Sequence, residues 1–366
     1  MPQESDHPVQ LNVAIIGFGM SARVFHAPLI QSSKHLALTT ILQRSSSSAK
    51  EVYPDVQVVH SAEELWAKKD VDLVIITTPN SSHYELATGA LKSGKDVVVE
   101  KPFTVTPKEA EDLTALAKST GRLLSVYHNR RWDGDFLTIQ KLLKDGILGR
   151  IVDYESHYDR YRPKPKPGNP WRERGDVPGS GIMYDLGAHL IDQALTLFGP
   201  ADSITADLTN QRQLPGHNVD DSFDLRLNYT SGIRVILRAG MLVRETGPRF
   251  MVFGTKGSFI KSGFDPQESK LKEGYKPGDP GFGEDEESAH GSLKGDVAGL
   301  GVDARIQTVP GSYITFYRAV AQAALRLRGK DEDAISEEER ATRVIRYIEA
   351  AVQSSKEGRT ISLKGQ

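Results

Sequence analysis

Residues 11–22 read LNVAIIGFGMSA, and this stretch decides the fold of the N-terminal part of the chain. Its first half is almost wholly apolar, which is typical of a central parallel strand buried on both faces. Its second half is a G-x-G-x-x-A pattern made by Gly17, Phe18, Gly19, Met20, Ser21 and Ala22. Gly17 permits a tight turn, Gly19 lets a pyrophosphate approach the backbone, and Ala22 lets the next helix pack closely. After an apolar strand, this pattern predicts a dinucleotide-binding site.

A second strand is expected at residues 36–42, and it ends in Gln43, Arg44 and Ser45. An NAD-binding fold places Asp or Glu here, where the carboxylate binds the ribose hydroxyls and would repel a 2′-phosphate. No acid follows until Glu51, whereas Arg44 offers a planar set of donors and Ser45 a hydroxyl. The strand end therefore predicts NADP(H) as the cofactor. The alternative is that Arg44 is a solvated loop residue.

Composition narrows the class of protein. The chain has 366 residues, too many for one ordinary core, which predicts two domains. The formal net charge of −2 gives no reason to expect nucleic acid or an anionic membrane as a partner. The absence of cysteine excludes disulfides, thiolate metal sites and cysteine nucleophiles. The N-terminus is polar and no apolar run reaches about 18 residues, so we expect a cytoplasmic protein without a membrane span.

Strand and helix patterns alternate through the first third of the chain. Further strands are expected at residues 56–59, 71–77, 96–99 and 123–126, and helices at 21–30, 62–68, 82–92 and 107–119. Pro28 should kink or restart the first helix. Such alternation predicts a Rossmann domain with a doubly wound parallel sheet, which we assign to residues 1–128.

The pattern changes beyond this point, and residues 129–366 are assigned to an α+β domain with a large open, mostly antiparallel sheet. Strands are expected at residues 151–161, 201–208, 221–229, 233–242, 251–253 and 258–260, and helices at 136–144, 181–198, 313–328 and 336–356. Ser336 and Glu339 have the spacing of a capping box. Residues 263–301 are rich in Gly and Pro with an acidic cluster, and are expected to form a mobile loop.

Glu100, Lys101 and Pro102 follow an expected parallel strand, and open α/β sheets bind ligands outside such strand ends. The proline disfavours a helical backbone at Lys101 and fixes this residue at the crevice. The alternative is a solvated surface lysine.

Asp185 and His189 have the i, i+4 spacing of residues on one helix face, and Asp192 lies on roughly the same side. One interpretation is a solvated polar stripe. The other is a histidine that exchanges a proton near pH 7, with a carboxylate affecting its pKa and orientation. A metal site is disfavoured, because a zinc site needs three or four ligands and no paired-histidine motif occurs.

Residues 127–132, YHNRRW, follow the last parallel strand where the chain crosses to the second domain. Their rings and hydrogen-bond donors suit a ligand cleft, although packing at a domain hinge would also explain them. Trp171 and Arg172 lie in a Pro-rich stretch that could reach the same cleft.

Three motifs together resemble the glucose–fructose oxidoreductase / inositol dehydrogenase family (Gfo/Idh/MocA): the N-terminal fingerprint, residues 100–102 (EKP) and residues 181–189 (GIMYDLGAH). The resemblance covers nearly the whole chain. Residues 129–133 (NRRWD) and 184–187 (YDLG) look most like the NADP-dependent scyllo-inositol dehydrogenase branch. Ala22 departs from the full glycine pattern, and its packing role tolerates this.

The resemblance implies a role for each matching residue. Lys101 would polarise the reacting oxygen, His189 would be the general acid/base, and Asp185 would orient His189 and the substrate. Expected cofactor contacts, besides the fingerprint and Arg44, are Ser45, Thr78, Pro79, Asn80, His83, Glu100, Lys101, Asn129, Trp171 and Arg172. Expected substrate contacts are Lys101, Asp185, His189 and Tyr158. No metal is implied.

The implied activity is hydride transfer between NADP(H) and a secondary alcohol or ketone of a polyol, inositol or sugar. One alternative is a dihydrodiol or other carbonyl dehydrogenase of the same architecture. Another is a non-enzymatic sensor resembling galactose-repressor proteins, because fold alone cannot separate these classes. The open face of the second sheet is expected to seek a partner through apolar positions, which predicts a homodimer or homotetramer.

Overall fold

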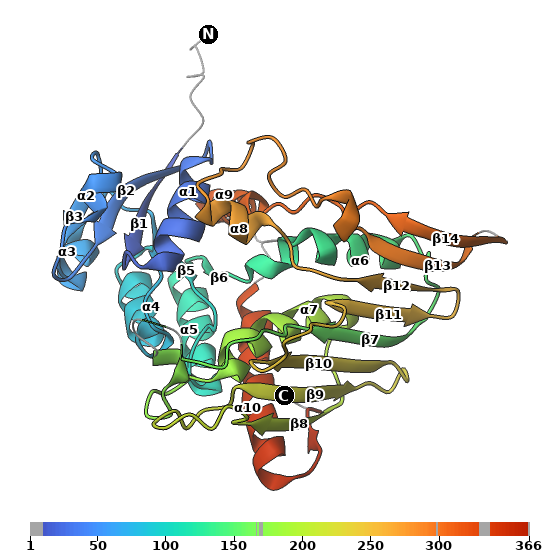
Figure 1. The fold of residues 1–366 in the computed structure, drawn as a ribbon. Coiled ribbons are helices and arrows are strands. Elements are labelled where there is room, and N and C mark those ends of the chain that lie inside the picture. The colour runs from blue at the N-terminus through green and yellow to red at the C-terminus, as the bar shows by residue number, and fades with distance from the viewer. Residues whose placement is uncertain (1–9, 166, 168–170, 298, 329–336, 365–366) are drawn as a thin grey trace.

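The computed structural model describes residues 10–165, 167, 171–297, 299–328 and 337–364 (Figure 1). A parallel sheet with its helices occupies the left of the view, and a larger sheet occupies the right. Ser336 of the expected capping box lies outside the described residues. Among the described residues, no helix is both long and apolar enough to cross a membrane.

The N-terminal sheet has six parallel strands in the order β3-β2-β1-β4-β5-β6. Their bounds are β1 Leu11–Ile16, β2 Leu36–Leu42, β3 Gln57–Val59, β4 Leu73–Ile76, β5 Asp96–Val99 and β6 Leu124–Val126. The chain leaves β1 in one direction to β2 and β3, and resumes on its other side at β4. The crevice outside the carboxyl ends of β1 and β4 is therefore the switch point where such folds bind ligands.

Short helices cover this sheet: α1 Ala27–Gln31, α2 Ala49–Val52, α3 Ala62–Ala67, α4 His83–Lys92 and α5 Pro107–Thr120. The helix expected at residues 21–30 is a π-helical turn, Ala22–His26, followed by α1, which restarts with Pro28 in its first turn as predicted. At α5, Thr106 and Glu109 form a reciprocal capping box, and Gly121 ends the helix in the left-handed conformation.

The second sheet has nine strands in the order β14-β13-β12-β11-β7-β10-β9-β8-β15. Their bounds are β7 Ile151–His157, β8 Ser203–Thr209, β9 Ser222–Asn228, β10 Arg234–Gly240, β11 Phe250–Gly254, β12 Gly257–Lys261, β13 Gly291–Val297, β14 Leu300–Ile306 and β15 Ile361–Ser362. Every pair is antiparallel except β7 with β10, which run parallel. The mostly antiparallel sheet predicted from the sequence is thus confirmed, and the parallel pair puts the carboxyl ends of β7 and β10 at one edge.

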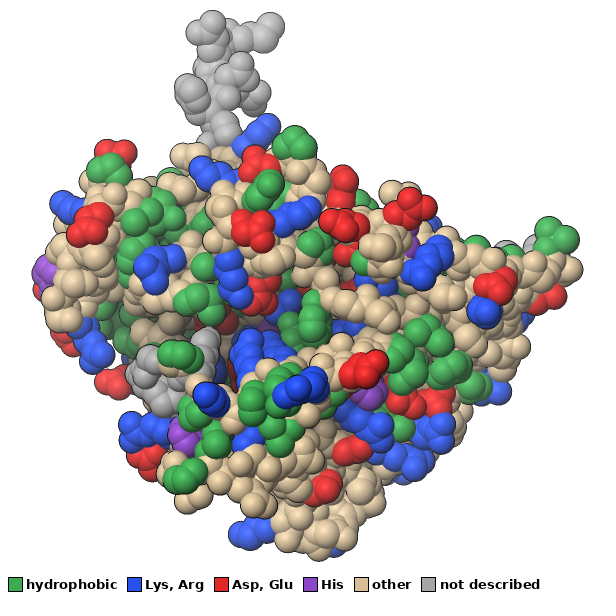
Figure 2. All heavy atoms as spheres, viewed as in Figure 1, with side chains coloured by type: hydrophobic (Ala, Val, Ile, Leu, Met, Phe, Trp, Pro, Cys, Tyr) green, Lys and Arg blue, Asp and Glu red, His purple; other side chains and the backbone are tan. Residues whose placement is uncertain are grey.

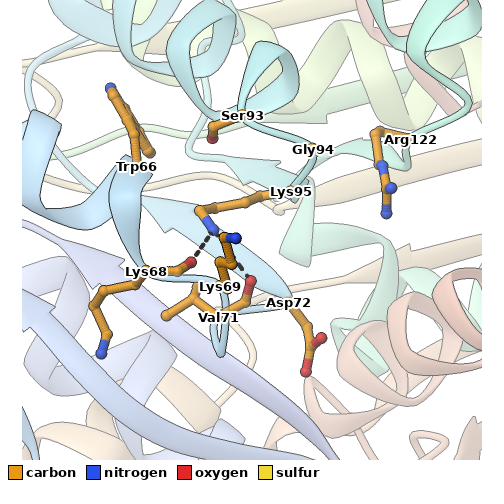
Figure 3. Close-up of a pocket in the computed structure, with 9 residues that line it drawn as sticks. All are labelled: Trp66, Lys68, Lys69, Val71, Asp72, Ser93, Gly94, Lys95 and Arg122. Atoms are coloured by element: carbon orange, nitrogen blue, oxygen red, sulfur yellow. Dashed lines mark hydrogen bonds between the residues drawn. The ribbon is translucent and has the colours of Figure 1, made fainter.

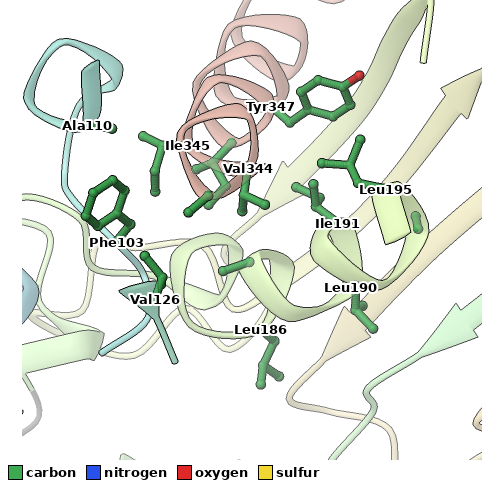
Figure 4. Close-up of a cluster of buried hydrophobic side chains, with 14 of the residues drawn as sticks. Phe103, Ala110, Val126, Leu186, Leu190, Ile191, Leu195, Val344, Ile345 and Tyr347 are labelled. Carbon is green, nitrogen blue, oxygen red and sulfur yellow. The ribbon is translucent and has the colours of Figure 1, made fainter. Parts of the chain in front are cut away.

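The remaining helices are α6 Gly134–Lys144, a π-helical turn at Met183–Gly187 continued by α7 Ala188–Phe198, α8 Gln267–Lys272, α9 Ile314–Arg328 and α10 Glu337–Glu357. Helices α7 and α10 share a core with the N-terminal part (Figure 4). On α10, Ile345 lies toward Phe103, and Ile191 and Leu195 of α7 point toward the same helix. Truncating a buried side chain here to alanine would cost about 2–5 kcal/mol. The contact fixes how α7, which carries His189, lies against the parallel sheet.

The expected mobile loop at residues 263–301 is wrong. The segment contains α8 and β13, and β13 pairs with β12 and with β14 at the edge of the nine-stranded sheet. Asp265 and Gln267 are buried, and Gly134 N–H donates to the Asp265 carboxylate. The Gly-rich composition of the segment did not indicate this order. Backbone pairing and a few buried polar side chains order the segment without a large apolar surface.

The outer face of the nine-stranded sheet is mixed rather than apolar. Arg234 pairs with Asp153, and Arg238 pairs with Asp224 at 2.5 Å. In one row across the sheet, Met251 and Ile260 are cross-strand neighbours, and Glu155 of β7 lies between Met251 and Ile236. Ile236 and Met251 are partly exposed, and Ile260 is exposed.

Candidate active site

The fingerprint loop follows β1 and has the shape that a pyrophosphate needs. Gly17 has a φ of +90°, and a Cβ there would lie 3.1 Å from Thr77 Oγ1. At Gly19 a Cβ would meet nothing within 4 Å, so the backbone faces open space. Ala22 is buried in the π-helical turn, as a packing residue should be. A dinucleotide phosphate therefore fits this cradle.

The flanking residues Phe18 and Met20 differ in exposure. The Phe18 ring packs edge-on against Tyr53, with ring centres 6.0 Å apart, whereas Met20 is 44% exposed. Both lie beside the cradle without filling it.

Arg44 and Ser45 are exposed in the loop after β2. The neighbouring Gln43 side chain orders this loop by donating to Ser46 and Ser48 and accepting from the Ala49 N–H. Among the described residues, none forms a hydrogen bond or ion pair with the Arg44 guanidinium. Its donors are therefore free for a phosphate group on a bound cofactor.

The loop after β4 holds the expected residues Thr78, Pro79, Asn80 and His83, and the last two are buried. Asn80 Nδ2 donates to the Gly179 carbonyl at 2.8 Å. Both His83 ring nitrogens lie against backbone carbonyls, those of Thr78, Pro102 and Phe103. The side chains of Asn80 and His83 therefore hold the loop from beneath, and the partly exposed Thr78 and the exposed Pro79 form its surface. Cofactor contact by these four residues stays a prediction.

Glu100 is tied to the fingerprint helix. Its Oε1 contacts Ser21 Oγ and lies 2.9 Å from His26 Nε2, and its Oε2 accepts the Lys101 N–H at 3.0 Å. His26 Nδ1 in turn contacts the Tyr317 hydroxyl of α9. Burial would raise the pKa of Glu100, but the hydrogen bonds from His26 and Ser21 lower it to about 2. Sequence analysis missed His26 and Tyr317, because nothing in an apolar helix pattern marks one histidine as a partner.

Lys101 and Asp185 lie in direct contact at the carboxyl end of β5. Lys101 Nζ donates to Asp185 Oδ1 at 2.8 Å and to the Asp185 carbonyl at 2.8 Å. The Lys101 side chain is 13% exposed, so the surface-lysine alternative is wrong. Arg172 Nε lies 3.5 Å from the same carboxylate oxygen. Burial opposes ionisation of Asp185, yet Lys101 and Arg172 hold its pKa well below its ordinary value.

His189 lies at the start of α7 and does not pair with Asp185 as the i, i+4 spacing suggested. The π-helical turn at Met183–Gly187 widens the helix there and changes which residues share a face. The Asp185 carboxylate turns to Lys101, and within the described chain no hydrogen bond joins it to the His189 ring. Asp192 does not pair with His189 either, because its carboxylate forms a buried two-point ion pair with Arg131, at 2.7 and 2.5 Å.

His189 is 5% exposed, and its Nδ1 has no hydrogen-bond partner among the described residues. Burial, the Lys101 cation and then Arg130 lower the pKa of His189 well below 6.5. The ring is therefore neutral near pH 7 and able to accept a proton.

The crossover residues have mainly structural partners. Asn129 is buried, and Arg130 donates to Glu268 at 2.5 Å and to the Tyr313 hydroxyl at 3.2 Å. Trp171 is partly exposed, with the Arg172 guanidinium 4.3 Å from its ring centre. Packing at the junction thus explains Arg130, whereas Arg172 borders Asp185 and stacks on Trp171.

Tyr158 is 3% exposed, and its ring lies against Arg130 and Arg249, two of the cations that lower the pKa of His189. Three guanidiniums lie 4.9 to 5.2 Å from its ring centre, those of Arg130, Arg160 and Arg249. The sequence does not mark Arg249 as a neighbour of Tyr158, since only the tertiary fold brings it there, and Arg160 lies two residues from Tyr158 with no motif to single it out.

A separate pocket of about 400 Å³ lies at the opposite edge of the parallel sheet, where Val71, Lys95 and Arg122 precede β4, β5 and β6 (Figure 3). Lys95 is buried there, and its Nζ donates to the carbonyls of Lys68 and Val71. The amino-end position separates this pocket from the residues described above, and Lys95 has a structural role in it.

Two family models match the chain, a NAD-binding Rossmann fold of an oxidoreductase family (GFO_IDH_MocA) at residues 11–128 and the C-terminal alpha/beta domain of that family at residues 140–363. The chain belongs to the Gfo/Idh/MocA oxidoreductase family. It is accordingly an oxidoreductase with a Rossmann domain for a nicotinamide dinucleotide.

Named relatives cover nearly the full length of the chain. The uncharacterized oxidoreductase YdgJ of Escherichia coli is 42% identical over 353 residues, 96% of this chain and 99% of its own. The scyllo-inositol 2-dehydrogenase (NADP(+)) IolW of Bacillus subtilis is 42% identical over 357 residues, which cover 97% of this chain and 96% of its own. Among solved structures, yvaA of Bacillus subtilis has a TM-score of 0.89 at 41% identity, covering 97% of this chain and 99% of its own.

Proposed function

We propose that this oxidoreductase transfers hydride between NADP(H) and a secondary alcohol or ketone of a polyol, inositol or sugar. The observation that carries the proposal is the Lys101–Asp185 contact at the carboxyl end of β5, beside the buried neutral His189. A cation and a neutral base at a crevice suit the removal of a proton from a hydroxyl group. The 42% identity to a scyllo-inositol dehydrogenase supports the substrate class.

In this proposal each of three side chains has a separate role at the reacting oxygen. His189 accepts the hydroxyl proton during oxidation and returns it during reduction. Lys101 stabilises the negative charge that develops on the oxygen. Asp185 holds the Lys101 ammonium in place and is a further contact for the substrate. When bound, the cofactor accepts or donates the hydride.

The cofactor would lie in the cradle of Gly17 and Gly19, with Arg44 and Ser45 at its 2′-phosphate. Support for NADP(H) is the exposed Arg44 guanidinium and the lack of a carboxylate at the end of β2. Glu100, Trp171 and Arg172 would border the nicotinamide end. The name of the IolW relative specifies NADP(+), which agrees with this choice.

We assign residues 1–128 to the cofactor domain and residues 129–366 to a domain for substrate binding and oligomerisation. Helix α9 of the second part packs into the core of the first through Phe316 and Tyr317. This contact supports a fixed junction in which a cofactor on the parallel sheet meets α7.

The test is the change in nicotinamide absorbance when purified protein and NADP meet a panel of polyols, inositols and sugars. We expect turnover of at least one member. A protein that binds NADP but turns over neither these nor dihydrodiols would instead be a sensor. Turnover of dihydrodiols alone would identify the other dehydrogenase class.

A further inference from the structure

A short extended segment after β7, residues 158–162, is called here the arginine arm. Its backbone is hydrogen-bonded to the end of β10 and the residue that follows. The N–H groups of Arg160 and Arg162 donate to the carbonyls of Gly240 and Met241 at 2.9 and 2.7 Å. The Val243 N–H returns a bond to the Arg160 carbonyl at 3.0 Å. The parallel pairing of β7 with β10 makes this possible, because both strands end at the same edge. The arm is therefore a fixed element of the fold.

The arm directs two arginines to one side. Side chains alternate along an extended chain, so Tyr158, Arg160 and Arg162 share a side opposite to Asp159 and Tyr161. Tyr158 is buried, and the Arg160 guanidinium lies 4.9 Å from its ring centre. The opposite side is occupied by the contact of Asp159 with His157, 3.2 Å apart. Arg160 and Arg162 therefore lie on the side of the active-site residues.

Positive charge exceeds negative charge in this region. Asp185 already faces two cations, Lys101 at 2.8 Å and Arg172 at 3.5 Å, and Arg160 adds to their effect in keeping its pKa low. Figure 2 shows Lys and Arg side chains gathered in a hollow in the middle of the viewed face. A single carboxylate at Asp185 cannot balance three cations, so the region has room for another negative group.

The other nearby acids have partners of their own. Glu268 accepts from Arg130 and from Lys272, both at 2.5 Å. Glu173 lies 3.5 Å from Arg212, within an ion-pair group that includes Asp221. Within the described ranges, no acid forms a hydrogen bond with the side chains of Arg160 or Arg162.

The two arginines also oppose each other. Arg162 is exposed overall, yet partial burial and then the nearby Arg160 cation lower its pKa. Asp185, Glu268 and Glu173 act in the opposite direction but do not cancel this effect. Repulsion between two such cations costs free energy, and a bound neutral hydroxyl group would offset little of that repulsion. A carboxylate or phosphate would relieve the repulsion and satisfy the planar donors of both guanidiniums.

We propose that Arg160 and Arg162, with Arg172, form an anion subsite that binds a carboxylate or phosphate group of the substrate. This inference rests on the proposed function, because it places the oxidised hydroxyl between Lys101 and His189. The substrate class is then a sugar acid or a phosphorylated polyol or inositol. The anionic group steers the substrate and fixes which hydroxyl reaches His189.

The experiment compares matched substrates that differ in charge: glucuronate with glucose, and inositol monophosphate with inositol. Steady-state kcat/KM is measured with NADP, and calorimetry on NADP-saturated protein measures binding separately from turnover. The variants are Arg160→Gln and Arg162→Gln, with Arg150→Gln as the control, an exposed arginine just before the start of β7. The glucuronate and phosphate pairs distinguish a carboxylate from a phosphate.

We expect at least one anionic member to be preferred over its neutral partner. Arg160→Gln should reduce that preference by about tenfold or more, as for a lost hydrogen bond to a charged group, and Arg150→Gln should not. Preference for the neutral members, no calorimetric binding of the anions, or a rise in KM for NADP alone in the arm variants would overturn the subsite. Turnover of neutral alcohols would then leave the proposed function standing. Anion binding without turnover of any of these substrates would support the subsite and contradict the proposed polyol, inositol or sugar dehydrogenase function.

Discussion

Lys101 Nζ and Asp185 Oδ1 lie 2.8 Å apart, although 84 residues separate them in the chain. Lys101 follows β5 of the parallel sheet, and Asp185 lies in the π-helical turn before α7. This contact joins the two parts of the fold at the crevice. It also leaves His189 without a carboxylate partner and next to a cation, which determines how this histidine titrates.

The pH dependence of oxidation should reflect that arrangement. Burial and the Lys101 cation lower the pKa of His189 well below 6.5, so the ring stays deprotonated and able to accept a proton as the pH falls through 6.5. We expect kcat for oxidation to stay level through pH 6.5 and to fall only at more acidic pH. Steady-state rates across the acidic range, with circular dichroism to confirm that the protein remains folded, test this. An acid limb at or above pH 6.5 would contradict the assigned environment.

The Arg131–Asp192 pair should be a large contributor to stability. Both side chains are buried and form two bonds, at 2.7 and 2.5 Å. Arg131→Gln leaves a buried carboxylate without its cation and should lower the free energy of unfolding by about 3–5 kcal/mol. The control is Arg346→Gln, which breaks a surface pair with Glu111 and should cost about 1 kcal/mol or less. If urea denaturation gave the same loss of unfolding free energy for Arg131→Gln and Arg346→Gln, burial of the Arg131–Asp192 pair would not increase its contribution to stability.

The outer face of the nine-stranded sheet should mediate self-association. Ile236, Met251 and Ile260 lie in one row across β10, β7, β11 and β12, with Glu155 of β7 between Ile236 and Met251. Such a mixed apolar and charged face suits a self-complementary interface. Light scattering at micromolar concentration should give a dimer or tetramer, and Met251→Asp should shift the mass toward a monomer. A monomeric wild-type protein would refute this prediction.

Arg44 should select the cofactor. Because Arg44 is exposed after β2 with no carboxylate beside it, Arg44→Ala should raise the KM for NADP by about 10- to 100-fold and change the KM for NAD far less. Lys50→Ala, at an exposed lysine in α2 just after this loop, is a comparison for loss of general positive charge. An unmodified protein whose kcat/KM favours NAD would contradict this reading of the strand end.

Local sequence signals predicted the parallel sheet well. The buried run at Asp96–Val99 has the bounds expected for it, and Thr106, Glu109 and Gly121 end α5 on both sides through hydrogen-bonding chemistry that is local in sequence. The glycine fingerprint likewise depends on a tight turn and on the close approach of a pyrophosphate to the backbone, both within six residues of sequence. Such features need no information from distant parts of the chain.

The missed features are those that depend on distant parts of the chain. The strands β13 and β14 are weakly apolar, and each is ordered by pairing, β13 with β12 and β14 with β13. The π-helical turn before α7 widens the helix and separates Asp185 from His189, contrary to a spacing rule for regular α-helices. Arg249 reaches Tyr158 only because β11 pairs with β7, whereas Arg160 lies two residues from Tyr158 in the chain.

The central claim is that Lys101 and His189 act at the reacting oxygen. Its most direct test is kcat of Lys101→Met and His189→Ala, measured with the dissociation constant for NADPH and with the exposed-lysine variant Lys92→Met as the control. We expect kcat to fall by about 100-fold or more in the first two variants, with NADPH affinity nearly intact and the control unaffected. Near-normal turnover in either Lys101→Met or His189→Ala would contradict the claim.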